Sequence, residues 1–222
     1  MVSELRKSSI TNPLLVLQEW LDEVRQSEIQ PNPNTMSIST VDSMGSPNSR
    51  MVLCREINEH LGYLVFYTNY NSKKSKEIES QTNCSALFHW DSLGYQVRIR
   101  GTLIKSPNLE SDDYFSTRKL GSQLSAWASN QSDHIKNRES LDNQFQEIMK
   151  QFDIQDADLD STDIKIPRPD FWGGYRIWVK EVELWLNQNN RFHDRLSFKR
   201  DLIETSSGFD SENNWVVERL QP

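Results

Sequence analysis

The strongest constraint on the fold is a change in hydrophobic period along the chain. From Thr35 to Lys105, apolar and polar residues alternate, which is typical of strands with one buried face. Strands are predicted at 35–41, 49–56, 63–68, 84–90 and 95–104, and again at 173–186, 193–200 and 214–220. Helices are predicted after Asn12-Pro13, from about Ser72 to Ser80, and at 108–118 and 134–152. This order predicts a mostly β fold with flanking helices (α+β), a closed antiparallel barrel with helices packed outside it.

The chain is expected to form one domain. Residues 1–11 are polar and predict a flexible N-terminal segment, and 12–222 would be the single domain. Within it, the acidic stretch 153–166 predicts a solvated linker loop. Asp156, Asp158 and Asp160 are spaced like the first ligands of a calcium loop, but Ser161 and Pro167 stand where that loop needs glycine and glutamate, so no metal site is expected.

Composition narrows the class of ligand. A net charge of -7 argues against bulk nucleic-acid binding, so local basic clusters point to a small anionic ligand. Seven Trp, nine Phe and six Tyr in an otherwise polar chain favour burial at a dimer interface. Two cysteines form no disulfide framework, and no signal peptide or membrane-spanning run is evident, so a cytoplasmic location is expected.

A basic cluster near the C-terminus predicts an anion site. On a strand, Arg191, His193 and Arg195 would point to the same face. Their charges would repel one another unless an anion lay over them, and guanidinium groups suit phosphate or carboxylate. The alternative is a solvated basic edge strand that nearby acids neutralise.

Two further stretches suggest anion binding. Ser72-Lys73-Lys74 opens a predicted helix, whose free N–H groups and lysines would together hold a phosphate, although solvent could instead screen the lysines. Arg50 and Arg55 flank a neighbouring strand. Tyr114 and Arg118, four residues apart and followed by Ser122, would form a second cradle, a weak pattern by itself. No glycine-rich phosphate loop and no hydrolase motif is present.

Taken in order, these segments resemble the pyridoxamine 5'-phosphate oxidase family from about residue 12 to 222. The motifs that carry the resemblance are Ser49–Arg55, Phe66–Thr68, Ser72–Lys74, Gln96-Val97, Tyr114–Ser122, Ala126–Ser132, Phe171–Gly174, Arg191–Arg195 and Arg219–Pro222. The resemblance implies an FMN-binding antiparallel split β-barrel that forms a homodimer, with one FMN in each of two clefts at the interface.

The resemblance also assigns roles to residues. Those that would bind FMN are Arg50, Met51, Val52, Leu53, Cys54, Arg55, Tyr67, Thr68, Lys73, Lys74, Gln96, Gln131, Ser132, Trp185 and Arg195. Arg50, Lys74 and the Gln131-Ser132 pair would hold the FMN phosphate. Those that would bind the substrate are Arg55, Tyr114, Arg118, Ser122, Arg191 and His193, the first four through its phosphate. Arg191 and His193 would be the catalytic residues above the pyridine ring.

The activity implied is oxidation of pyridoxamine or pyridoxine 5'-phosphate to pyridoxal 5'-phosphate, with O2 reduced to H2O2. Alternatives are a phenazine-biosynthesis-type flavin oxidase acting on a carboxylated tricyclic substrate, and a non-catalytic split barrel that binds flavin or heme. The chain departs from the family pattern at Arg55 (usually lysine), Lys73 (usually arginine) and Lys119-Leu120 (usually Pro-Arg). Its N-terminus lacks the family's Arg-Glu-Tyr stretch, which bears on substrate closure.

Overall fold

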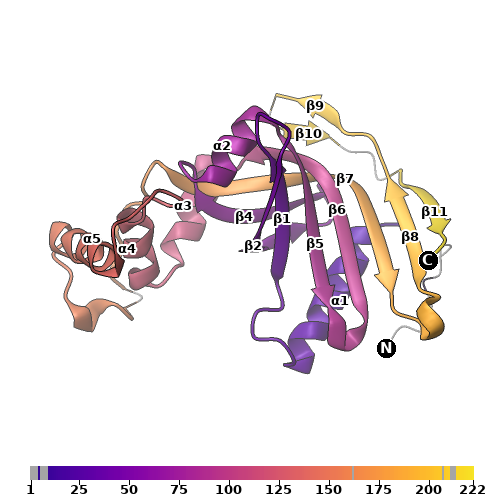
Figure 1. Cartoon of the computed structure of the whole chain (residues 1–222), viewed down its shortest axis with the longest axis horizontal. Coiled ribbons are helices and arrows are strands. Elements are labelled where there is room, and N and C mark those ends of the chain that lie inside the picture. The colour runs from indigo at the N-terminus through magenta and orange to yellow at the C-terminus, as the bar shows by residue number, and fades with distance from the viewer. Residues whose placement is uncertain (1–4, 6–9, 162, 207, 211–213) are drawn as a thin grey trace.

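The computed structural model describes residues 5, 10–161, 163–206, 208–210 and 214–222. The strands are β1 (Thr35–Val41), β2 (Pro47–Leu53), β3 (Glu56–Asn58), β4 (Tyr63–Asn69), β5 (Asn83–Trp90), β6 (Tyr95–Lys105), β7 (Trp172–Leu186), β8 (Asp194–Lys199), β9 (Ile203–Thr205), β10 (Gly208–Asp210) and β11 (Val216–Leu220). The helices are α1 (Pro13–Ser27), α2 (Lys73–Ser80), α3 (Asn108–Ser116), α4 (Leu120–Ala128) and α5 (Arg138–Gln151) (Figure 1).

The long strand β7 organises one antiparallel sheet of nine strands. The hydrogen-bonded order is β11-β8-β7-β6-β5-β1-β2, and β4 pairs with the first half of β7 while β8 pairs with its second half. A register shift between Arg100 and Gly101 marks a β-bulge in the pairing of β6 with β7. Among the described strands β2 does not pair with β4, so the sheet curls without closing (Figure 1). The mostly β architecture and the split barrel that the family resemblance implies are confirmed, whereas the closed barrel predicted from the hydrophobic period is wrong.

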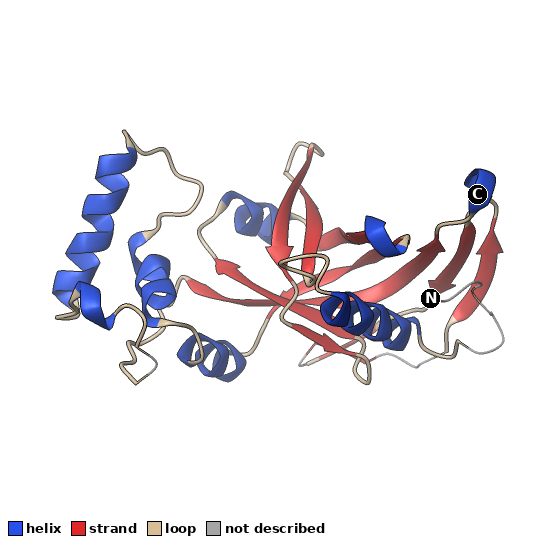
Figure 2. Cartoon of the chain, turned by 90° about the horizontal axis from the view of Figure 1, so that it is seen from below, coloured by secondary structure: helices blue, strands red, loops and turns tan. Residues whose placement is uncertain are grey.

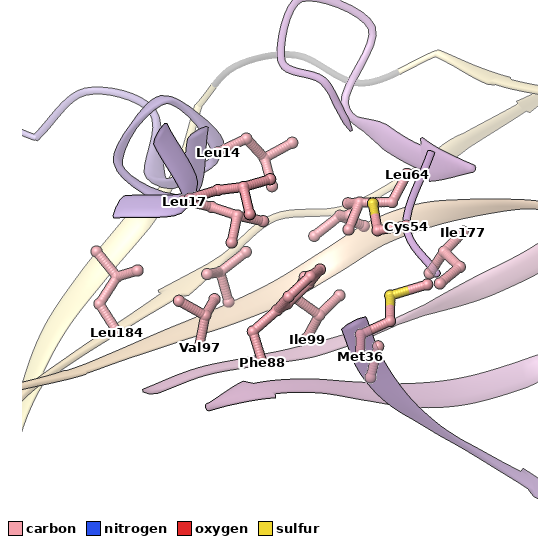
Figure 3. Close-up of a cluster of buried hydrophobic side chains, with 14 of the residues drawn as sticks. Leu14, Leu17, Met36, Cys54, Leu64, Phe88, Val97, Ile99, Ile177 and Leu184 are labelled. Atoms are coloured by element: carbon pink, nitrogen blue, oxygen red, sulfur yellow. The ribbon is translucent and has the colours of Figure 1, made fainter. Parts of the chain in front are cut away.

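Helix α1 covers the main core. The Asn12 side chain caps it by accepting a hydrogen bond from the Leu14 N–H (3.0 Å), with Pro13 in the first helical position. Its apolar stripe, which includes the fully buried Leu14 and Leu17, packs against the inner face of the sheet, where Figure 3 shows Phe88, Val97 and Ile99. The ring of Trp20 stacks on that of Tyr95 at 4.3 Å.

Helices α3, α4 and α5 lie beyond one end of the sheet (Figures 1 and 2) around a second apolar cluster. The prediction of a helix at 108–118 is confirmed in position, but α4 was not predicted, because its Gly and Ser residues weaken the helical pattern. Helix α5 begins at Arg138 and not at 134, because the Asn137 side chain caps it by accepting a hydrogen bond from the Ser140 N–H (2.9 Å).

The acidic stretch 153–166 does more than link two elements. Its acidic side chains are exposed except for the half-buried Asp158, but Ile154 and Ile166 are buried in the second apolar cluster. The predicted flexible segment 1–11 falls mostly outside the described residues, although Leu5 is buried and its N–H donates to the Asp194 carboxylate at 2.8 Å. In the described part of the chain, no helix is both long enough and apolar enough to span a membrane.

Candidate active site

A cavity of about 680 Å³ opens between β2, the end of β4, the start of α2 and the helices α3 and α4. Thirteen of the predicted site residues line it, together with other residues that were not predicted to belong to the site. The thirteen are Arg50, Met51, Val52, Leu53, Arg55, Tyr67, Thr68, Lys73, Lys74, Tyr114, Arg118, Gln131 and Ser132. Residues that are distant in the sequence therefore meet in one place, as the resemblance implies.

Lys74 is a buried cation whose hydrogen-bond partners are neutral. Its Nζ donates to Gln131 Oε1 (2.7 Å), Thr68 Oγ1 (2.8 Å) and Ser72 Oγ (3.0 Å), and the residue is 8% exposed. Burial lowers the pKa of Lys74 to about 8, the charge of Arg50 acts in the same direction, and the carboxylate of Glu77 opposes both. An anion placed beside Lys74 would favour its charged form and raise its pKa again.

Arg50 is held by a carboxylate that the sequence argument missed. Its Nη2 lies 3.0 Å from Oε2 of Glu77, which is 4% exposed, and its Nη1 donates to Thr40 Oγ1 at 2.6 Å. Burial alone would raise the pKa of Glu77, but hydrogen bonds from Thr40, Asn48 and Arg50 keep it below its usual value. The available signal was an acid three residues after Lys74 on the same helix.

A stack of aromatic rings forms another wall of the cavity. Tyr67 lies 3.9 Å from Tyr114 and 5.5 Å from Trp172, measured between ring centroids, and the planes differ by 13° and 10°. Cζ of Arg118 lies 4.6 Å from the Trp172 ring and Cζ of Arg55 lies 5.7 Å from the Tyr114 ring. Trp172 belongs to the Phe171–Gly174 motif, but the sequence predicts no role for it. The two glycines that follow it were the available signal, because they indicate close packing.

Two predicted residues from segments that border this cavity do not face it. The Cys54 side chain is buried in the main core (Figure 3), where desolvation raises the pKa of its thiol to about 12. Ser122 is exposed on α4 and is not among the residues that line the cavity.

The remaining predicted residues gather at the far end of β7. Gln96, Trp185 and Arg195 are neighbours across β6, β7 and β8, and the His193 ring lies 4.5 Å from that of Trp185. The Arg195 guanidinium donates from Nε (3.1 Å) and Nη2 (3.0 Å) to Oε1 of Glu183.

The prediction that Arg191, His193 and Arg195 share one strand face is wrong. Strand β8 begins only at Asp194, and Arg191 lies in a short 3-10 turn over Asn189–Arg191. Asn190 and Arg191 have φ values of 58° and 62° there. Asparagine tolerates this left-handed backbone, which explains why the chain turns before the strand starts. Arg191 is exposed in the turn.

The two groups of residues lie at opposite ends of one strand. Trp172 lines the cavity at the start of β7, and Trp185 belongs to the second group near its end. Thirteen steps of about 3.3 Å put them roughly 40 Å apart along the strand. The second group, defined as Gln96, Trp185, Arg191, His193 and Arg195, is therefore remote from the cavity of the same chain.

Comparison with known proteins decides the family. Residues 21–152 match the family model for pyridoxamine 5'-phosphate oxidase, and residues 172–222 match that for the pyridoxine 5'-phosphate oxidase C-terminal dimerisation region. The pyridoxine/pyridoxamine 5'-phosphate oxidase of Paraburkholderia phytofirmans is 38% identical over 95% of this chain and 89% of its own length. The enzyme of the same name from a Ruegeria species is also 38% identical, over 95% of this chain and 94% of its own length.

The chain belongs to the pyridoxamine 5'-phosphate oxidase family. Members of this family are FMN-dependent oxidoreductases, which gives the chain its enzyme class and its cofactor. Its fold also matches solved structures. PhzG from Burkholderia lata, in complex with tetrahydrophenazine-1-carboxylic acid, is 25% identical with a TM-score of 0.82, covering 100% of this chain and 99% of that one. A pyridoxamine 5'-phosphate oxidase-related, FMN binding protein from Nostoc punctiforme has a TM-score of 0.66 at 15% identity, which shows the shared fold.

The cavity has the chemistry that FMN needs. Lys74 and Arg50 supply two cations where a phosphate would bind, and Gln131 and Ser132 add polar groups beside them. The Nη1 group of Arg118 is buried without a hydrogen-bond partner in the described structure, which leaves a donor for a second anion. The residues present therefore fit a phosphorylated cofactor with an anionic ligand next to it.

Proposed function

We propose that this protein oxidises pyridoxamine 5'-phosphate or pyridoxine 5'-phosphate to pyridoxal 5'-phosphate, with O2 as the electron acceptor and H2O2 as the second product. The observation that carries the proposal is the presence of two separate cation groups in one cavity. Arg50 and Lys74 form one group, and Arg55 and Arg118 form the other. A phosphorylated cofactor and a phosphorylated substrate would together need two such groups.

The site would be completed by a second copy of the chain. The group around Trp185 is remote from the cavity of its own chain, and all of its members except Gln96 lie within the region that matches the dimerisation model. In a homodimer, Gln96, Trp185 and Arg195 of one protomer would face the FMN held in the cavity of its partner. Arg191 and His193 would come with them and lie over the substrate ring.

FMN, when bound, would supply the redox chemistry, which is the transfer of two electrons from the substrate to O2. The chain's own residues bind and orient the substrate. Arg55, Tyr114 and Arg118 would hold its phosphate, and Arg191 would clamp the ring. Because the substrate's amine or alcohol carries its own lone pair, no strong base is required, and His193 would donate a hydrogen bond or move a proton.

The test is to add pyridoxamine 5'-phosphate to the FMN-loaded protein without oxygen and follow the flavin absorbance near its visible maximum. We expect bleaching that recovers when air is admitted, together with formation of pyridoxal 5'-phosphate. Unphosphorylated pyridoxamine is the matched control and should bleach the flavin far more slowly. Absence of bleaching with a fully loaded protein would contradict the proposed substrate.

The likeness to PhzG supports a second candidate, oxidation of a carboxylated tricyclic substrate. A planar guanidinium such as that of Arg55, where lysine is usual in the family, binds a carboxylate as well as a phosphate. The two candidates separate in the same experiment, because a dihydrophenazine carboxylate would then bleach the flavin and pyridoxamine 5'-phosphate would not.

A further inference from the structure

Aromatic rings, and not carboxylates, hold two of the arginines in the cavity. The Arg118 guanidinium lies over Trp172 and near Phe115, with Cζ 4.6 Å and 5.7 Å from the ring centroids, and Arg55 lies over Tyr114. In the described structure neither arginine is within ion-pair distance of an acid. Both charges are therefore available to a ligand.

Arg118 is anchored through its backbone, and its guanidinium has unused hydrogen-bond donors. Its backbone carbonyl accepts a hydrogen bond from Gln123 Nε2 at 2.8 Å, which anchors the residue at the start of α4. Its Nη1 is buried with no partner among the described residues. Burial lowers its pKa, which Tyr114 opposes and the neighbouring Arg55 reinforces, so the guanidinium would gain from a nearby anion.

Trp172 provides a rigid surface beneath that guanidinium. The residue is 7% exposed, and Phe115 contacts it edge-on at 5.1 Å while Tyr67 stacks at 5.5 Å. The Trp172 backbone N–H donates to the Pro169 carbonyl at 3.0 Å. A ring face attracts a guanidinium without using the N–H groups in its plane, whereas a carboxylate in the same position would use those donors and cancel the charge.

We propose that Trp172 is a positioning residue that sets the preference for a phosphorylated substrate. Its indole face orients Arg118 so that the free donors and the uncancelled charge point at the substrate's anionic group. This inference rests on the proposed function and deepens it, because it names the contact through which the substrate's phosphate group would strengthen binding.

The test compares the dissociation constants of pyridoxal 5'-phosphate and pyridoxal for the FMN-loaded protein. We expect a strong preference for the phosphorylated compound in the unchanged protein. Trp172→Leu should reduce that ratio by about tenfold, the order expected for a desolvated cation–π contact, and Trp172→Phe should retain part of it. In an Arg118→Met background, Trp172→Leu should have no further effect on the ratio, because the partner is gone.

Trp127→Leu is the matched control. Trp127 packs on Phe152 and Phe171 in the same helical cluster but lies over no guanidinium in the described structure, so its loss should leave the ratio unchanged. The role of Trp172 would be overturned if Trp172→Leu left the ratio of the two dissociation constants unchanged. It would also be overturned if Trp172→Leu reduced that ratio equally in the presence and absence of Arg118. An unchanged protein that binds the two compounds equally would instead overturn the phosphorylated substrate, and the inference with it.

Discussion

At the scale of single residues, Lys74 makes FMN binding depend on pH. Its pKa is lowered to about 8 in the free protein, so about half of it has lost the proton at that pH and most of it has done so at higher pH. Phosphate binds the charged form and raises the pKa again, and binding above pH 8 therefore requires proton uptake. We expect FMN affinity to fall by about tenfold per pH unit above 8, measured by quenching of flavin fluorescence.

Replacing Lys74 by methionine should weaken FMN binding and remove this pH dependence. Lys76→Met is the control, since Lys76 is exposed on the same helix and does not line the cavity. If the FMN affinity of the Lys74→Met protein depended on pH in the same way as that of the unchanged protein, a group other than Lys74 would be responsible for the pH dependence.

The identities of charged site residues could be predicted from the sequence, but their environments could not. Ser72-Lys73-Lys74 marked an anion site, and Lys74 does lie in the cavity. Glu77 and Trp172 were missed, because their partners, Arg50 and Arg118, are distant in the sequence. Side-chain pairing across elements is set by packing, which a local pattern does not contain.

At the scale of elements, the start of β7 is packed too tightly to accept another side chain. A Cβ on Gly174 would lie 2.5 Å from Ser106 Oγ and 3.0 Å from Tyr67 Cε1. Gly174→Ala should therefore push the Tyr67 ring out of its stack and destabilise the protein by about 1–3 kcal/mol in urea denaturation. It should also weaken ligand binding in the cavity.

Gly121→Ala is the matched substitution for that experiment. Gly121 is in α4, and a Cβ there would meet nothing closer than 3.6 Å. Alanine is the better helix former, so this change should stabilise the protein by up to about 1 kcal/mol. Equal effects of the two substitutions would mean that the packing at Gly174 is not limiting.

Strands were predicted better than helices and turns. The alternation in Thr35–Val41 or Tyr95–Lys105 reflects one buried face, which the sheet reproduces. Helix α4 and the turn at Asn189–Arg191 depend on contacts and backbone conformations that hydrophobic period does not report. Arg191, a predicted catalytic residue, therefore lies in an exposed turn and not on the strand where it was expected.

At the scale of the whole molecule, the distribution of the site predicts complementation between chains. Arg118 lines the cavity near the start of β7, and His193 lies against Trp185 near its other end. If each site combines the cavity of one protomer with the second group of its partner, Arg118→Met and His193→Ala would disable opposite halves. Each variant alone should be nearly inactive.

Mixing the two variants under conditions that exchange protomers should restore activity. In a mixed dimer, one site takes both altered residues and the other takes none, so one of its two sites is complete. Random exchange makes about half of the dimers mixed, and the expected recovery is about a quarter of the unchanged protein's activity. A site built within one chain gives no recovery at all, because every site then contains one altered residue. Activity before and after exchange, with the dimer population followed by native mass spectrometry, therefore decides where the site is assembled.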